Sequence, residues 1–227
     1  MPVLWGQARS CTQLEAAAGS RRPRQVPAAV VILASYLAGS VPFSNIVSRR
    51  SSGVDLRDVG TGTVSGTSLF ATSGFGPLSL AGCCELAKGA LGPLLARDRR
   101  ALGSLATAAA IIGHDWSPWL GGQGGRGMSV LLGSSLVCSR RGAAVIGAGM
   151  GMGRVARHSA LGTLVALVGF PFVARGRAGG LLPALSCVAP ILVKRAMGND
   201  HSWPRSMGQW VDRLLYDRGP LVQRLRR

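Results

Sequence analysis

The chain has 227 residues, 47% of them hydrophobic and 33 of them glycine, and its 26 Lys and Arg outnumber 9 Asp and Glu to give a net charge of +17. Soluble domains rarely combine such an excess of cations with so much apolar sequence. The cations separate apolar runs instead of forming one basic face, which argues against a nucleic-acid partner. They are better suited to short loops that face anionic lipid headgroups or anionic substrates.

The first 25 residues are polar and rich in Arg, and they lack an apolar run long enough for a signal peptide, so we expect a disordered basic tail over residues 1–25. Residues 26–47 are apolar and reach the roughly 20 residues that a membrane-spanning helix needs. Further apolar stretches follow at residues 75–96, 101–119, 128–138, 142–153, 160–174 and 180–193.

Several of these stretches are short, and a run of about 10 to 14 apolar residues fits a buried soluble helix or a re-entrant segment equally well. Their number and their regular separation by Arg favour an all-α, polytopic membrane helix bundle of about seven transmembrane helices, forming one domain over residues 26–195. In the fifth stretch, Gly147 with Gly151 and Gly149 with Gly153 are small-residue pairs that predict close helix packing rather than a ligand site.

Residues 196–227 form a basic C-terminal tail. An interfacial amphipathic helix around residues 210–215, with Asp212 and Arg213 on its wet face, is one interpretation, and a merely solvated tail is the other. With seven spans and the N-terminus outside, the Lys and Arg of this tail place the excess of positive charge in the cytoplasm.

Between the first two apolar stretches, residues 53–68 form a polar segment that we call the hydroxyl loop. It contains Asp55, Arg57 and Asp58, followed by glycines and the hydroxyl side chains of Thr61, Thr63, Ser65, Thr67 and Ser68. So many hydroxyl donors in little space suit a phosphate or a polyol. From composition alone a flexible surface loop is an equal alternative.

Glu85 and Lys88 lie within the second apolar stretch, three residues apart and therefore on one helix face. Ionisable groups inside a span usually face the bundle interior or a wet cavity. We expect the two side chains to neutralise each other and to orient neighbouring loops, and direct proton transfer by Glu85 is the alternative.

The segment from residue 113 to residue 127 joins an apolar stretch to a glycine-rich loop with one cation, Arg126. We call residues 121–127 the glycine loop, because glycine stands at 121, 122, 124, 125 and 127. Backbone N–H groups that carry no side chains can turn toward an anion, so the loop suits a phosphate. The spacing also matches a dinucleotide fingerprint, but no strand precedes it, and Met128 stands where a P-loop needs lysine.

The five cysteines and three histidines show no metal-ligand spacing, so we expect no metal site. Most of the cysteines lie in apolar stretches and are expected to be small core residues.

Four motifs in order resemble those of the bacterial acyl-phosphate:glycerol-3-phosphate acyltransferases, integral membrane enzymes of phospholipid synthesis, over roughly residues 28–195. They are Gly39-Ser-Val-Pro-Phe43, Gly53-Val-Asp-Leu-Arg57 running into Gly60-Thr-Gly62, Glu85-Leu-Ala-Lys-Gly89 for the family's Asp-x-x-Lys-Gly, and Gly113-His through Gly127 for its Gly-His-x-x-x-Pro and Lys-Gly-Gly-Lys-Gly elements.

The resemblance implies a seven-helix fold in the cell membrane, with active-site loops on the cytoplasmic side. The enzyme would transfer a fatty acyl group from acyl phosphate to glycerol-3-phosphate, giving lysophosphatidic acid and phosphate without cofactor, coenzyme A, acyl carrier protein or metal. Besides these two substrates and membrane lipid it implies no further partner.

The site residues that the resemblance implies fall into three groups. Arg126 and Ser159 are the candidate catalytic residues. Substrate would be bound by Arg57, Gly60, Thr61, Gly62, Thr63, Thr67, Ser68, Gln123, Gly124, Gly125, Gly127 and Arg157. Glu85, Lys88 and His114 are expected to be structural or orienting.

The chain also departs from the family pattern. Ala71 replaces an Arg, Gln123 and Arg126 replace two Lys, and Ala160 stands at a hydroxyl position unless Ser159 substitutes for it. The family's C-terminal His-Arg-x-Asn element is barely recognisable near Lys194, Arg195 and Asn199. A catalytically weakened homologue that binds lipid, or serves as a membrane interaction protein, is therefore the alternative to an active acyltransferase.

Overall fold

The computed structural model describes residues 25–60, 62–199 and 202–216, and this part of the chain is helical, with no strand. The expected tail over residues 1–25 lies almost entirely outside the described residues. The helices are α2 (Ala28–Ser40), α3 (Phe43–Ser52), α4 (Gly66–Ser73), α5 (Phe75–Ala96), α6 (Arg100–Asp115), α7 (Met128–Cys138), α8 (Arg140–Val155), α9 (Ser159–Ala178), α10 (Leu181–Met197) and α11 (Met207–Leu215), with single 3₁₀ turns η1 (Leu56–Asp58) and η2 (Pro118–Leu120).

Every apolar stretch of the sequence is a helix, so the all-α class is confirmed for the described residues. The first stretch is interrupted. Val41 is extended, and Pro42 precedes α3, so α2 ends at Ser40 and the chain turns before α3 begins. Proline removes a backbone donor and disfavours helix at the residue before it, which accounts for the break.

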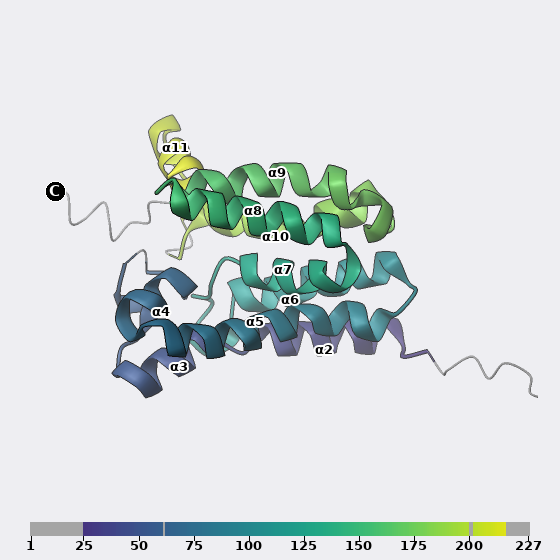
Figure 1. Ribbon diagram of the computed structural model, residues 1–227, viewed down its shortest axis with the longest axis horizontal. Coiled ribbons are helices and arrows are strands. Elements are labelled where there is room, and N and C mark those ends of the chain that lie inside the picture. The colour runs from purple at the N-terminus through teal and green to yellow at the C-terminus, as the bar shows by residue number, and fades with distance from the viewer. Residues whose placement is uncertain (1–24, 61, 200–201, 217–227) are drawn as a thin grey trace, which may run out of the picture.

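Helices α2 and α5 to α10 run along the long axis of the molecule and pack side by side, while α3, α4 and α11 lie at one end (Figure 1). The closest pairs are α2 with α6, α5 with α6 and α7, α8 with α9, and α10 with α6 and α9. A cluster of buried apolar side chains from α6 to α10 forms the main core, including Ile111, Leu131, Ile146, Leu167 and Ile191.

Glycines set the spacing within three of these pairs. A Cβ atom on Gly39 of α2 would lie 2.2 Å from the carbonyl oxygen of Ala110 in α6. A Cβ on Gly89 of α5 would lie 2.1 Å from the carbonyl oxygen of Val130 in α7. Because no side chain fits at these distances, the helix backbones themselves are in contact there.

The predicted small-residue pairs of α8 behave differently from each other. A Cβ atom on Gly149 would lie 2.6 Å from the carbonyl oxygen of Gly162 in α9, and one on Gly153 would lie 3.1 Å from the Cα atom of Gly162. Gly147 and Gly151 have nothing within 4 Å of such an atom. One pair therefore packs α8 against α9, and the other faces open space.

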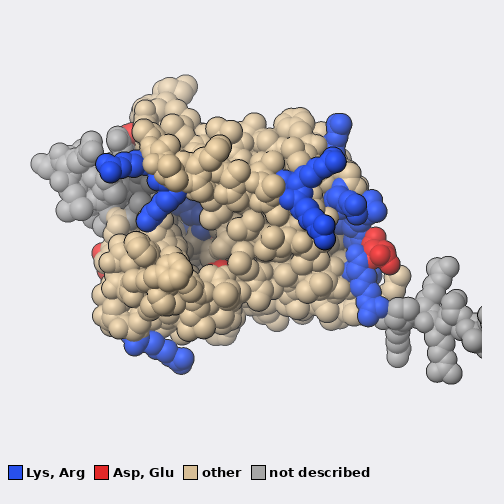
Figure 2. All heavy atoms as spheres, viewed as in Figure 1, with Lys and Arg blue, Asp and Glu red and all other residues tan. Residues whose placement is uncertain are grey.

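Three helical segments of the described chain are long and apolar enough to cross a membrane: Ala28–Ser52, Phe75–Ala96 and Ser159–Ala178. Large apolar side chains are exposed along the bundle, for example Leu33, Leu80 and Val165. On the face drawn in Figure 2, Lys and Arg gather at the two ends of the long axis and leave a belt without Lys or Arg between them. This is the distribution of a membrane-embedded bundle.

The polar segments meet at one end of the bundle. The α3–α4 connection, the α6–α7 connection, the α8–α9 turn and the end of α10 all lie at the end where α4 and α11 are labelled in Figure 1. The hydroxyl loop and the glycine loop, more than 50 residues apart in the sequence, are thereby neighbours at this end.

The C-terminal helix α11 is present, but the expectation for Arg213 is wrong. This side chain is 7% exposed, and its guanidinium donates to the carbonyl oxygens of Ala196 (3.0 Å), Met197 (2.7 Å) and Ser202 (2.5 Å). The last carbonyls of a helix have no partner within that helix, and Arg213 satisfies two of them at the end of α10. The helical pattern in the sequence could not show that these carbonyls lie beside α11.

Candidate functional site

The glycine loop is folded back onto the end of α6. The N–H of Gly124 donates to the carbonyl oxygen of Asp115 (3.2 Å), and the N–H of Gly125 donates to that of His114 (3.1 Å). A Cβ atom on Gly124 would lie 2.0 Å from the His114 oxygen, and one on Gly125 would lie 2.2 Å from Nε2 of His114. The path of the loop therefore requires glycine at both positions.

The hydroxyl loop is joined to the glycine loop at Gly124. The carbonyl oxygen of Gly124 accepts from the N–H of Val64 (3.3 Å) and from Nδ2 of Asn199 (3.4 Å). The same Asn199 amide donates a short hydrogen bond to the carbonyl oxygen of Gly62. Asn199 follows the end of α10, so three distant segments meet at this point.

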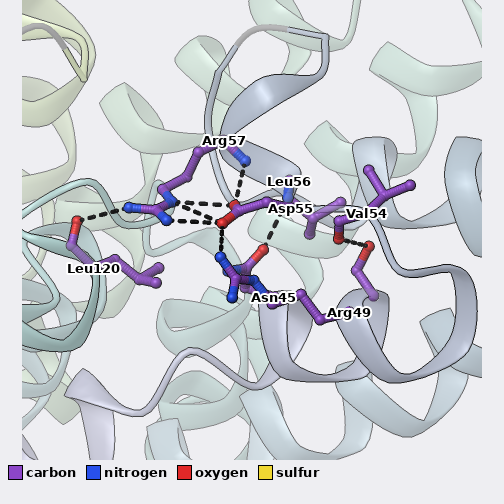
Figure 3. Close-up of polar contacts among 8 residues, drawn as sticks. Asn45, Arg49, Val54, Asp55, Leu56, Arg57 and Leu120 are labelled. Carbon is purple, nitrogen blue, oxygen red and sulfur yellow. Dashed lines mark hydrogen bonds and ion pairs between the residues drawn. The ribbon is translucent and has the colours of Figure 1, made fainter.

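Arg57 belongs to the hydroxyl loop and lies in its 3₁₀ turn, η1. Its guanidinium forms an ion pair with Asp55, with Nη2 2.7 Å from Oδ2, while Nη1 donates to the carbonyl oxygen of Leu120 at 3.5 Å (Figure 3). Arg49 contacts the same carboxylate from α3, and the side chain of Asn45 accepts the N–H of Leu56 (2.8 Å). Hydrogen bonding to Arg57 holds the pKa of Asp55 well below its usual range and raises the pKa of Arg57, so both groups are charged.

Arg126 is half-buried within the glycine loop, and its Nε and Nη1 atoms are shielded from solvent. Burial lowers the pKa of Arg126 to about 9, as does repulsion by Arg195, whereas the charge of Asp115 raises it. The guanidinium therefore remains positive at neutral pH.

Lys194 of α10 supplies a second cation to the loop. Its side chain is 1% exposed, and Nζ donates to the carbonyl oxygen of Gly122 (2.9 Å) and lies 5.2 Å from the ring centroid of Trp116. Lysine is almost never buried without partners. Here a carbonyl and an aromatic face hold the ammonium beneath the loop.

Behind the glycine loop, Glu85 and Lys88 of α5 form the predicted pair, with Nζ 2.7 Å from Oε2, and both side chains are buried. His114 completes the cluster, because its Nδ1 lies 3.0 Å from Nζ of Lys88 and 3.2 Å from Oε2 of Glu85. Lys88 also donates to the carbonyl oxygens of Gly39 (3.0 Å) and Val41 (2.9 Å). The cluster therefore connects the end of α2 to the residue on which Gly125 rests, which is an orienting arrangement.

The other predicted residues are spread over this end of the bundle. Gly60 and Gly62 have positive φ angles of 60° and 70°, and Gly127 has 61°. Thr63 is buried, Ser68 and Gln123 are half-buried, and Thr67 is exposed on α4. Thr61 lies outside the described residues.

Arg157 is exposed in the turn between α8 and α9, and Ser159 is exposed as the first residue of α9. The hydrogen bonds that join this turn to the rest of the bundle come from Arg195, which donates to the carbonyl oxygen of Ala160 (2.7 Å) and to the hydroxyl of Thr163 (3.0 Å). The structure thus brings Arg157 and Ser159 to the same end as the loops, without a contact between them and the glycine loop among the described residues.

Sequence reasoning missed three residues of this region: Asp115, Lys194 and Asn199. The sequence shows Lys194 and Asn199 only as parts of a barely recognisable C-terminal motif, which predicts no role for either. Asp115 lies next to His114, and no local pattern distinguishes it. A basic side chain within the last turns of an apolar helix was the available signal for Lys194.

Among the described residues, no group of three or more His, Cys, Asp or Glu is arranged to hold a metal ion. The N–H groups of residues 121–125, which the sequence predicts to turn toward an anion, all donate to backbone carbonyl oxygens of residues 114–120. The polar groups gathered at this end are instead hydroxyls and three cations, Arg57, Arg126 and Lys194. Such an array binds and orients phosphate groups, and it stabilises negative charge that develops on a departing phosphate.

Comparison with known proteins identifies the family of this chain. Residues 29–198 match the family described as glycerol-3-phosphate acyltransferase. The chain is 33% identical over 169 residues to a glycerol-3-phosphate acyltransferase of Synechococcus sp. (strain CC9902), covering 72% of this chain and 84% of the relative. It is 34% identical over 183 residues to one from Anaeromyxobacter sp. (strain Fw109-5), covering 75% and 89%.

Two solved structures are also similar. One is the glycerol 3-phosphate form of PlsY, an integral membrane glycerol 3-phosphate acyltransferase, with a TM-score of 0.66, 25% identity, and coverage of 74% of this chain and 88% of that chain. The other is the lysophosphatidic acid form, with a TM-score of 0.64 and 19% identity, covering 81% and 98%, which supports the fold alone.

Proposed function

Because the chain belongs to the glycerol-3-phosphate acyltransferase family, whose product is lysophosphatidic acid, we propose that acyl phosphate is its acyl donor and that the joined glycine and hydroxyl loops bind the two phosphate groups. The observation that carries this proposal is the junction at Gly124, where both loops and Asn199 meet. Arg126 follows two residues later, and Lys194 donates to the carbonyl oxygen of Gly122 in the same loop.

The chemistry asks little of the protein beyond positioning and charge stabilisation. A hydroxyl of glycerol-3-phosphate attacks the acyl carbonyl carbon, a new C–O ester bond forms, and the C–O bond to phosphate breaks. Phosphate leaves with the bonding electron pair, and the hydroxyl proton is taken up by the released phosphate. Holding both reactants in place and stabilising the charge on the departing phosphate with cations both lower the barrier.

Each predicted residue has a part in this proposal. Arg126 contacts the phosphate whose charge grows, and Arg57 with the hydroxyl side chains of its loop holds the phosphate of glycerol-3-phosphate. Glu85, Lys88 and His114 orient the loops. Arg157 and Ser159 lie further out on the rim, where they would meet substrate entering from the membrane.

The membrane arrangement is the second part of the proposal. The seven apolar stretches correspond to α2 with α3 and to α5 through α10, each crossing or partly crossing the bilayer, and the loops of the site face the cytoplasm. Helix α11 lies in the interface, because Met207 is 77% exposed and Trp203 is 53% exposed at this end of the bundle.

The experiment is a transferase assay with purified protein in lipid, acyl phosphate and radiolabelled glycerol-3-phosphate. We expect lysophosphatidic acid and one phosphate released per product. A parallel assay replaces acyl phosphate with acyl coenzyme A, and activity only with the thioester would show that the donor assignment is wrong. If neither donor is used by protein whose helical circular dichroism is intact, a lipid-binding or scaffold role replaces catalysis.

A further inference from the structure

Helix α11 lies outside residues 29–198, the part of the chain that matches the acyltransferase family, so membership of the family assigns it no role. It packs against α9 and α10 (Figure 1). Two buried arginines join it to α10 in both directions. Arg195 of α10 donates from Nε to the carbonyl oxygen of Arg213 in α11 (3.4 Å). Arg213 donates back to the carbonyl oxygens of Ala196 (3.0 Å) and Met197 (2.7 Å), so α11 is fastened to the last turn of α10.

The last turn of α10 determines where Asn199 lies. Gly198 follows the helix with a φ angle of 69°, a left-handed conformation that glycine adopts without strain, and the chain turns there. The next residue, Asn199, donates from Nδ2 to the carbonyl oxygens of Gly62 and Gly124, one in each loop of the site. A shift of the end of α10 would therefore move Asn199 away from the loops that it joins.

Arg213 also holds the chain on the other side of Asn199. Its Nη1 donates to the carbonyl oxygen of Ser202 (2.5 Å), and its Nη2 donates to the hydroxyl of the same residue (3.1 Å). A guanidinium presents several N–H donors in fixed directions, which suits it to joining several acceptors at once. One side chain of α11 thus contacts the backbone both before and after Asn199.

We propose that Arg213 is a positioning residue for substrate binding: by holding the chain on both sides of Asn199, it fixes the amide that joins the hydroxyl loop to the glycine loop. The two loops then keep the relative position in which they bind glycerol-3-phosphate. The inference rests on the proposed function, since that function assigns phosphate binding to these loops. It adds that a helix beyond the part of the chain shared with the family controls the affinity of the site.

The test is a double-mutant cycle in the transferase assay, with Arg213→Ala, Asn199→Ala and both changes together. We expect each single variant to raise the KM for glycerol-3-phosphate about tenfold, with a smaller change in kcat, because the loops lose a hydrogen-bonded link. The double variant should lie within about twofold of Asn199→Ala, because residues that act through one contact are not additive. Arg205→Ala removes an exposed cation from the same segment and is the matched control, which should keep the KM of the parent.

A merely structural role for Arg213 predicts a different result. Loss of folded protein lowers the measured kcat and leaves the KM unchanged, and independent effects multiply in the double variant. An unchanged KM in Arg213→Ala, or a KM in the double variant that is the product of the two single effects, would therefore overturn the inference. If Arg213→Ala does not fold, Arg213→Met, which keeps the apolar stem and removes the donors, takes its place in the cycle and is judged in the same way. Failure of the parent to use glycerol-3-phosphate with either acyl donor would instead count against the proposed function, and the basis of the inference would fall with it.

Discussion

Two buried charge clusters lie next to each other in this protein, and they differ in whether their charged groups are paired with one another. In the cluster of Glu85, Lys88 and His114, carboxylate, ammonium and imidazole lie within 3.2 Å of one another. In the cluster beneath the glycine loop, Asp115 accepts no hydrogen bond from the described residues, and Lys194 bonds to a backbone carbonyl rather than to a carboxylate. The first cluster is closed, and the second keeps an excess of positive charge.

The difference indicates what each cluster is for. A closed cluster satisfies its own charges, so it fixes the relative positions of α2, α5 and α6 and has little affinity to offer a ligand. A cluster with excess positive charge gains most when an anion enters. We therefore expect the cluster beneath the glycine loop, with its excess positive charge, to bind ligand, and the balanced cluster of Glu85, Lys88 and His114 to stabilise the fold.

Breaking the closed cluster should give the largest effect. Replacing Glu85 or Lys88 alone, by Glu85→Leu or Lys88→Leu, leaves an unpaired charge out of water and should lower the free energy of unfolding by about 3 to 5 kcal/mol. The double variant should be milder because no charge is left behind. Thermal unfolding in detergent measures all three, and single variants as stable as the parent would mean that the cluster does not hold the helices together.

Breaking the open cluster should affect binding and leave the fold intact. Arg126→Ala removes charge-assisted hydrogen bonds to phosphate and should weaken phosphate binding by about 10- to 100-fold in calorimetry, with the melting temperature nearly unchanged. Arg175→Ala, an exposed cation at the other end of the bundle, is the control and should bind as the parent does. Equal affinity for the parent and Arg126→Ala would remove the glycine loop from the site.

Asp55 and its partners Arg49 and Arg57 form a third charge cluster, which is closed like that of Glu85 but lies near the surface. Asp55→Asn should lower the free energy of unfolding by about 1 to 2 kcal/mol at neutral pH. The pKa of Asp55 is held below its usual range, so its stabilisation is present above the unfolded value of about 3.9 and is lost as the pH falls through the folded value. The gap between parent and variant should therefore narrow in strong acid, and a gap that stays constant would show that charge is not its cause.

Substitutions at Ala71 and Ala160, outside the open cluster, should give the smallest effect. Ala71→Arg and Ala160→Ser restore groups that the family pattern has at these positions, but Arg126 and Lys194 already supply cations at the loop. We expect the double variant to release phosphate no faster than the parent, within about twofold or slower. A clear rise in the rate would identify the parent as a weakened enzyme and would show that the two cations do not compensate for the lost groups.

The helices could be predicted from the sequence because each long apolar run must satisfy its backbone internally in a membrane, which leaves helix as the only form. The break at Val41 and Pro42 was not predicted, because residues 26–47 were expected to form one span, although Pro42 is a local signal for it. The helix α4 was not predicted, because residues 66–73 combine hydroxyls with a few apolar residues and show no run of sufficient length.

The site was predicted in its parts and not in its connections. The glycine loop, the hydroxyl loop and the pair of Glu85 and Lys88 each carry a local pattern. Asn199 donates to two carbonyls from different loops, and Lys194 of α10 donates to a carbonyl of the glycine loop. Contacts of this kind depend on how helix ends meet in space, and no spacing along the chain records them.

The glycine contacts between helices bear on how the enzyme accommodates a fatty acid. Where Gly39 meets Ala110 and Gly89 meets Val130, the backbones touch without room for a methyl group. A hydrocarbon tail therefore cannot thread between α2 and α6, or between α5 and α7, at these levels. Any path for the acyl chain must avoid both contacts, and a larger residue at Gly39 or Gly89 would push the helices apart rather than narrow a channel for the chain.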